Sequence, residues 1–312
     1  MTTKIQKSLV ALAVGATFAA SGAVMATTLT WDSSASSPTA PVDGAGTWNT
    51  TGTNWSNGTT DVPWNNTADS GYLASFGSYS TSNPVGTVTL GNNITAGGLV
   101  SNAGYAGNYT IAGSSSYGLT LTGSSVVANA SFTLSANTTF QQGLYLTGGQ
   151  NLTLSGTNTN SVGTTVTAGT LNVVFPASGV TNGNFSAALG TGSVTVDSGA
   201  MLSFNSNGFG PTSLNTGTIA NNMTISGVAS NLYNTALQFT GNSVVYTDTG
   251  TISISNTPEI FVFGLGTTAN LNGVISGSGG LTLTGQGNGS SDSQAISLGA
   301  ADTYSGATTI IS

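Results

Sequence analysis

The sequence predicts an all-β chain: a parallel β-helix (β-solenoid) that opens with a tryptophan-rich capping segment. Two observations lead to this fold class. Short stretches alternate apolar and hydroxyl residues between glycines, which is typical of half-buried strands joined by tight corners. Some stretches also repeat, since residues 118–123 and 280–285 both read GLTLTG, and residues 152–166 align without a gap on residues 296–310. Repeated strand–corner–strand units indicate a stack of similar turns.

The chain begins with the features of a secretory signal peptide. Lys4 and Lys7 are followed by an apolar run over residues 9–20 and then by small residues up to Ala26. This order is typical of a signal peptide, and the run is shorter than the ~20 apolar residues of a transmembrane helix. We expect residues 1–26 to be removed. No later stretch predicts a membrane-spanning helix in the mature chain.

Residues 27–86 form the second predicted segment and contain all the tryptophans: Trp31, Trp48, Trp55 and Trp64. Two interpretations are open. The aromatic faces would suit glycan stacking, which would make the segment a polysaccharide-binding module. Alternatively, the bulky rings cover the open first turn of a stack, because stacked repeats need caps at their ends. We favour the cap.

From residue 87 to residue 312 the alternation is regular and predicts the β-solenoid itself. Strand-like stretches such as 109–111, 119–121, 132–134 and 144–146 recur about every ten to thirteen residues, as expected of short strands with turns between them. No apolar period of 3.6 residues indicates a helix. Turns of about 20–25 residues would give around a dozen rungs. A β-sandwich is the alternative fold.

The closing residues resemble a known repeat. Residues 280–285 (GLTLTG) and 302–310 (DTYSGATTI) are similar to the autotransporter-associated β-strand repeat. A more divergent copy lies near residues 152–173. That repeat occurs in passenger regions of bacterial autotransporters and in related surface proteins. The resemblance implies a secreted or cell-surface protein, associated with the outer membrane, with a structural or adhesive role as a stalk.

The last residues, Ile311 and Ser312, come just before the place where a Gly-Thr-Leu strand follows the earlier copy, at residues 169–171. We therefore expect a truncated chain whose final rung has an unpaired edge. Such an edge pairs readily with another chain, so self-association through the C-terminal rung is expected. Extracellular polysaccharide and other cell-surface components are the other expected partners.

The composition excludes most catalytic chemistry. The chain has no Cys or His, and its only basic residues are Lys4 and Lys7. After residue 26 all nine acids are therefore uncompensated, a formal charge of −9. Such a chain has no nucleophile–base pair, no Schiff-base lysine and no His or Cys zinc ligand. Without cations it binds neither the phosphates of nucleic acid nor anionic lipid headgroups.

One catalytic scheme is left: a pair of carboxylates, as in glycoside hydrolysis. The candidate acids are Asp197, Asp248, Glu259, Asp292 and Asp302. Lone acids at glycine-rich corners more often accept hydrogen bonds from turns. We therefore predict no enzyme activity, cofactor or metal, and keep a carboxylate-dependent glycan hydrolase as the weaker alternative. No side chain after residue 26 has an ordinary pKa between about 5.5 and 9, so we expect stability to be flat over that pH range.

Overall fold

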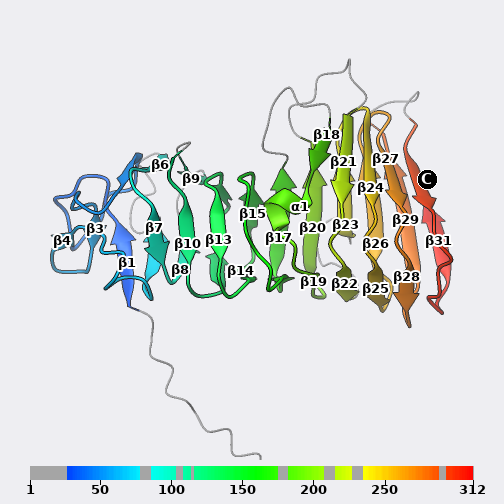
Figure 1. Ribbon diagram of the computed structural model, residues 1–312, viewed down its shortest axis with the longest axis horizontal. Coiled ribbons are helices and arrows are strands. Elements are labelled where there is room, and N and C mark those ends of the chain that lie inside the picture. Colours follow the sequence, from blue (N-terminus) through cyan, green and yellow to red (C-terminus); the bar gives the residue numbers. More distant parts are fainter. Residues whose placement is uncertain are drawn as a thin grey trace, which may run out of the picture.

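The computed structural model describes residues 27–77, 86–102, 108–113, 116–174, 182–206, 215–226, 235–287 and 293–311. The predicted signal peptide lies outside them. In the described residues the chain is nearly all β, and its strands stand side by side along one long axis (Figure 1). Neighbouring strands come from successive turns of the chain and are mostly parallel. This stacking of rungs in long parallel sheets is consistent with a β-solenoid.

The first long sheet, here called sheet I, has twelve strands in the order β28-β25-β22-β19-β16-β14-β11-β8-β5-β1-β3-β4. All its pairs are parallel except β1 with β3 and β3 with β4. In chain order its strands are β1 (Thr28–Trp31), β3 (Trp55–Ser56), β4 (Asp61–Val62), β5 (Leu73–Phe76), β8 (Gly98–Ser101), β11 (Ser125–Ala128), β14 (Leu144–Gly148), β16 (Thr164–Val166), β19 (Val194–Val196), β22 (Met223–Ser226), β25 (Ile252–Ser255) and β28 (Ile275–Gly277).

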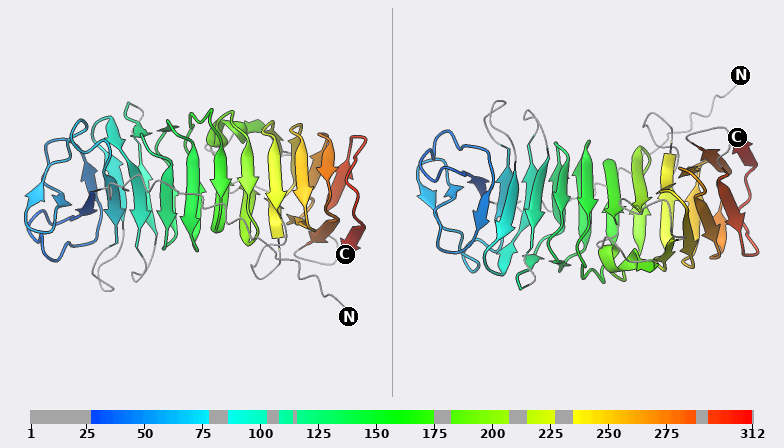
Figure 2. Two further views of the ribbon diagram at one scale, coloured as in Figure 1. Left: turned by 90° about the horizontal axis from the view of Figure 1, so that it is seen from below. Right: turned by 90° about the horizontal axis from the view of Figure 1, so that it is seen from above.

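The second long sheet, sheet II, has eleven strands, all paired in parallel with the next turn. Figure 2 shows the stack from two further sides. The strands of sheet II are β2 (Gly46–Trp48), β6 (Thr87–Leu90), β9 (Tyr109–Ala112), β12 (Phe132–Leu134), β15 (Asn151–Leu154), β17 (Gly169–Val174), β20 (Ala200–Asn205), β23 (Thr235–Thr240), β26 (Glu259–Phe263), β29 (Leu281–Gln286) and β31 (Thr308–Ile311).

A third face precedes sheet I in most turns, and its strands form two smaller parallel sheets. One contains β7 (Ile94–Ala96), β10 (Leu119–Leu121) and β13 (Thr138–Phe140), and the other contains β18 (Asn182–Asn184), β21 (Asn215–Ile219), β24 (Val244–Asp248), β27 (Thr268–Leu271) and β30 (Ala295–Leu298). The four-residue helix α1 (Ser186–Leu189) lies between β18 and β19. It is a small exception to the all-β expectation. No helix in the described residues is long and apolar enough to cross a membrane.

The core is a column of apolar side chains that point inward from successive turns. In sheet II the paired positions Val88, Ile111, Leu134 and Leu154 begin one such column, and all four are almost fully buried. On each of these strands, the residues next to the buried positions are mostly threonines, and these face outward. Each buried aliphatic side chain stabilises the fold by about 1.5–3 kcal/mol. Apolar–hydroxyl alternation therefore determines which side of each strand is buried, as the sequence predicts.

The repeated stretches do not occupy equivalent places in the stack. The first GLTLTG supplies β10 on the third face, whereas the second supplies β29 in sheet II. Likewise residues 152–154 lie in sheet II, but the aligned residues 296–298 lie on the third face. All three faces bury the same alternating pattern, so one strand–corner–strand unit fits on any pair of faces. The repeats therefore mark strands and corners, and they do not mark the period of the coil.

The turns also vary in length more than the expected 20–25 residues. Residues paired across adjacent turns are separated by 19 positions between Thr153 and Asn172, and by 35 positions between Ser203 and Gln238. Sheet II accordingly has eleven strands where around a dozen rungs were expected. The long sheets also continue across the predicted boundary at residues 86 and 87, because β5 pairs with β8 and β2 pairs with β6.

Candidate functional site

The four tryptophans meet inside the first turns of the stack. Trp48, Trp55 and Trp64 pack against one another with ring centroids 4.8–5.0 Å apart, and Trp31 contacts Trp55 edge-on at 5.4 Å. Their exposed fractions are 0–1 %. Rings this deeply buried have no free face to offer a sugar, so the arrangement argues against glycan stacking at these residues.

Hydrogen bonds fix this cluster only in part. The Trp31 Nε1–H donates to the Gly44 carbonyl at 3.0 Å, and the Trp64 Nε1–H donates to the Thr95 carbonyl at 2.9 Å. The Nε1 atoms of Trp48 and Trp55 are buried without a hydrogen-bond partner among the described residues. Packing of the aromatic rings therefore outweighs the cost of two unpaired donors, which is about 1–3 kcal/mol each.

The described carboxylates among the five catalytic candidates are not brought together. Asp197 directly follows β19 of sheet I, Asp248 ends β24 on the third face, Glu259 begins β26 of sheet II, and Asp302 lies in the last turn before β31. Asp292 lies outside the described residues. No group of three metal-ligating side chains occurs in the part of the chain that the structure describes. These positions give no support to a catalytic carboxylate pair.

Glu259 is bound by hydroxyl groups from both neighbouring strands. Thr235 donates to Oε2 at 3.1 Å, and Thr284 donates to Oε1 at 2.6 Å. Asp302 accepts a bond from the Ile275 backbone N–H at 2.8 Å. Both acids therefore connect adjacent rungs of the stack, which differs from the local capping of tight corners that the sequence favoured.

Asp248 has the most unusual environment of these acids. Asp248 is 1 % exposed; its Oδ1 accepts the Gly250 backbone N–H at 3.0 Å, and its Oδ2 has no hydrogen-bond partner among the described residues. Burial raises the pKa of Asp248 to about 7, despite the opposing effect of the Gly250 hydrogen bond. Because no second acid lies on the strands that pair with it, β21 and β27, this is an isolated buried acid.

Sequence reasoning missed a pair of acids beside the tryptophans, Asp32 and Asp61. Burial alone would raise the pKa of Asp32, but hydrogen bonds from Ser34, Val42 and Ser37 lower it below its ordinary value. Burial raises the pKa of Asp61, and the charge of Asp32 adds to this effect. The two acids are far apart in the sequence, so only the pairing of β1 with β3 and of β3 with β4 reveals them.

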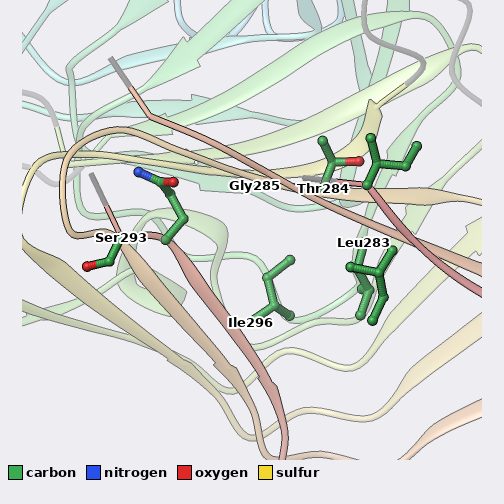
Figure 3. A pocket seen from close by; sticks show the side chains of 8 residues that line it. Leu283, Thr284, Gly285, Ser293 and Ile296 are labelled. Carbon is green, nitrogen blue, oxygen red and sulfur yellow. The ribbon is translucent and has the colours of Figure 1, made fainter. Parts of the chain in front are cut away.

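One hollow lies at the C-terminal end of the stack and has a volume of about 310 Å³. Leu283 and Ile296 line it together with Thr284, Gly285 and Ser293, as Figure 3 shows. Ile310, on β31, is 77 % exposed and also lines it. The side chains that line this hollow are aliphatic or neutral and polar, so it can pack against apolar groups, and none of its lining residues is an acid or a base.

A second hollow of about 200 Å³ lies on the outer surface of sheet I, beside Tyr145. It is lined by residues of four adjacent strands, β11, β14, β16 and β19, or of the corners before them. Comparison with known proteins does not assign either hollow. No protein-family model matches the chain, and neither a curated protein nor a solved structure matches it.

Proposed function

We propose that this chain is an exported structural and adhesive protein of the bacterial cell surface: a parallel β-helix stalk without catalytic activity. The supporting observation is sheet II, in which eleven strands from β2 to β31 stack side by side in parallel pairs, with one register shift between β23 and β26. Each turn in such a stack contacts only its neighbouring turns, so added turns make the body longer and not wider. An extended body with a predominantly apolar core suits a stalk better than an enzyme.

The tryptophan cluster serves this stalk as an N-terminal cap. The short strands β3 and β4 continue sheet I beyond β1 in antiparallel pairing, so the regular parallel stack stops there. The buried rings fill the interior of these first turns. Terminal caps keep stacked repeats soluble and prevent them from pairing end to end. A polysaccharide-binding role for these four rings is therefore the weaker alternative.

The surface location rests on the sequence. Residues 1–26 have the order of regions of a signal peptide. The segments GLTLTG and DTYSGATTI resemble the autotransporter-associated β-strand repeat, whose members are surface proteins. The carboxylate-dependent hydrolase stays the least supported alternative, because the described candidate acids lie on different faces.

Protease treatment of intact cells tests this proposal. The mature chain has no Lys or Arg, so trypsin has no cleavage site in it, whereas proteinase K cleaves without that requirement. On intact cells of the bacterium that makes the protein, we expect proteinase K to remove the antibody signal and trypsin to leave it unchanged. N-terminal sequencing of the extracted protein should begin at or near Thr27. A protein that keeps Met1 would refute export, and one that proteinase K reaches only after lysis would refute the surface location.

A further inference from the structure

Tyr145 stands out on the outer face of sheet I because its neighbours are small. The register aligns one outward residue from each adjacent strand, and every member of this row carries a hydroxyl: Ser125, Tyr145, Thr165, Thr195, Thr224, Ser253 and Ser276. Tyr145 is the aromatic member of this row and is 44 % exposed. Cross-strand neighbours normally cover part of an outward aromatic ring. Here Ser125 and Thr165 are too short to do so.

The hollow beside this ring, which we call the Tyr145 groove, crosses the strands. Its polar lining comes from Ser124, Gln142, Thr165 and Thr195, and Val162 adds an apolar edge that is 62 % exposed. Four strands at a spacing of about 4.8 Å span about 14 Å along the axis of the stack. The groove therefore runs along the stack, near its middle, where β14 lies (Figure 1).

Glycines at the corner before sheet I let the backbones of adjacent turns approach closely beside this groove. Gly143 and Gly163 both have positive φ angles, +82° and +132°. A Cβ atom added at Gly143 would lie 2.6 Å from the Gly163 carbonyl oxygen, and one added at Gly163 would lie 2.9 Å from that of Ser193. Because the backbones approach so closely, no side chain fits at these corners. The backbones of adjacent turns therefore stay close together at these corners, and the walls of the hollow beside them come from side chains such as Tyr145 and Val162.

The chemistry of the lining selects an uncharged ligand. None of the ten lining residues is charged at neutral pH. An anion gains nothing here, because the mature chain has no cation. A cation finds no carboxylate in the groove. An exposed aromatic face beside several hydroxyl and amide groups instead matches a ligand with apolar C–H faces and many neutral hydroxyls.

We propose that the Tyr145 groove is a subsite for a neutral glycan chain that lies along the stack. Tyr145 stacks on one sugar ring, while Gln142, Thr165 and Thr195 exchange hydrogen bonds with its hydroxyls. This inference deepens the adhesive part of the proposed function by naming the class of ligand. The binding test below does not depend on export or on surface location, so the two proposals fail separately.

Titration calorimetry on the purified mature chain tests the subsite. The probes are neutral hexasaccharides (maltohexaose, cellohexaose, laminarihexaose and chitohexaose), with the anionic hexamer of galacturonic acid as the charged comparison. We expect at least one neutral probe to bind with a Kd of about 1 mM or tighter, and the anionic hexamer not to bind. Tyr145→Ala should weaken that binding about ten-fold, whereas Tyr145→Phe, which keeps the ring, should stay within about three-fold of the natural chain.

Tyr117→Ala is the matched control, because Tyr117 is also exposed, by 37 %, and does not line the groove. It should bind the glycan like the natural chain. Thr165→Val removes a lining hydroxyl but keeps the β-branched shape, so it should weaken binding a few-fold with an unchanged melting temperature. Absence of binding by every neutral probe at about 10 mM would overturn the proposal. Equal binding by the Tyr145→Ala chain, or binding of the anionic hexamer with similar affinity, would also overturn it.

Discussion

Among single residues, Asp248 has the clearest consequence for stability. In the folded chain its pKa is about 7, against an ordinary value of 3.8, because burial disfavours the charged form. The expectation of a flat stability profile, drawn from ordinary pKa values, therefore fails at this residue. The folded state holds the proton more tightly than the unfolded state, so stability is highest below about pH 4 and falls as the pH rises toward 7.

We expect the free energy of unfolding to decrease from pH 4 to pH 7 and to level off above pH 7. If the full shift in the pKa of Asp248 is converted to free energy, the free energy of unfolding decreases by as much as about 4 kcal/mol. Asp248→Asn keeps an acceptor for the Gly250 N–H and carries no charge, so it should remove most of this slope and stabilise the chain at pH 8. Urea denaturation at pH 4.5, 6 and 8 measures both effects. Asp197→Asn, a change at a partly exposed acid, is the control, and an equal slope in the Asp248→Asn chain would contradict the assignment.

Asn221 illustrates how polar residues hold the corners in a chain without ion pairs. Its side-chain amide donates to the carbonyls of Gly190 and Gly192 at 2.8 Å, and its Oδ1 accepts the Ser186 hydroxyl at 2.7 Å. Asn221→Ala would leave buried groups unpaired and should destabilise the chain by about 1–3 kcal/mol. Asn270→Ala, at a partly exposed outward position of β27, should change stability by less than about 0.5 kcal/mol. Similar midpoints for the two variants in urea would show that the buried bonds contribute little.

Among the elements, the positions of the strands in the sequence could be predicted, but the sheet that each strand joins could not. The stretches 109–111, 119–121, 132–134 and 144–146 all lie in strands, with their apolar residues inward. Which face each strand joins was hidden, because the identical segments β10 and β29 fit two different faces equally well. The helix α1 was missed because four residues are too few to establish a 3.6-residue period.

The Tyr145 groove could not be predicted from the sequence for the same reason. Alternation shows that Tyr145 faces outward, but the groove exists only because Val162, Thr165 and Thr195 come to lie beside it from later turns. Those turns differ in length, so the neighbours of Tyr145 cannot be counted off from a fixed repeat. Burial of the tryptophans, by contrast, agrees with the cap that the sequence favoured, since a cap requires rings that face inward.

The C-terminal end of sheet II should have a lower local stability than its middle. Strand β31 has one neighbour, β29, and all four of its residues are exposed, whereas β17 pairs on both sides. We therefore expect fast amide hydrogen exchange over residues 295–311 and strong protection in β15 and β17. Appending a further rung after residue 312 should slow exchange in β31 and reduce self-association, because it pairs the open edge. Equal protection of the β17 and β31 amides from hydrogen exchange, measured by mass spectrometry, would contradict the inference that β31 is a locally unstable edge strand.

For the whole molecule, the unbalanced charge determines how stability responds to salt. After residue 26 the sequence has nine acids and no Lys, Arg or His, so the side-chain charges there can only repel one another. Four of these acids, Asp32, Asp43, Asp61 and Asp69, lie in the first turns with the tryptophans. There the charge of Asp32 already raises the pKa of Asp61. Repulsion should therefore weaken the N-terminal turns more than the rest of the stack.

We expect added salt to stabilise the protein at pH 7.5, because the Debye length falls from about 30 Å at 0.01 M to about 3 Å at 1 M and screens this repulsion. Tryptophan fluorescence reports on the N-terminal turns alone, since all four tryptophans are there, whereas circular dichroism reports on the whole stack. The melting midpoint from fluorescence should rise more steeply with sodium chloride than the midpoint from circular dichroism. Asp61→Asn should reduce that difference by removing one of the two interacting charges. Midpoints that stay constant or fall between 10 mM and 500 mM salt would mean that repulsion among the acids does not limit the stability of these turns.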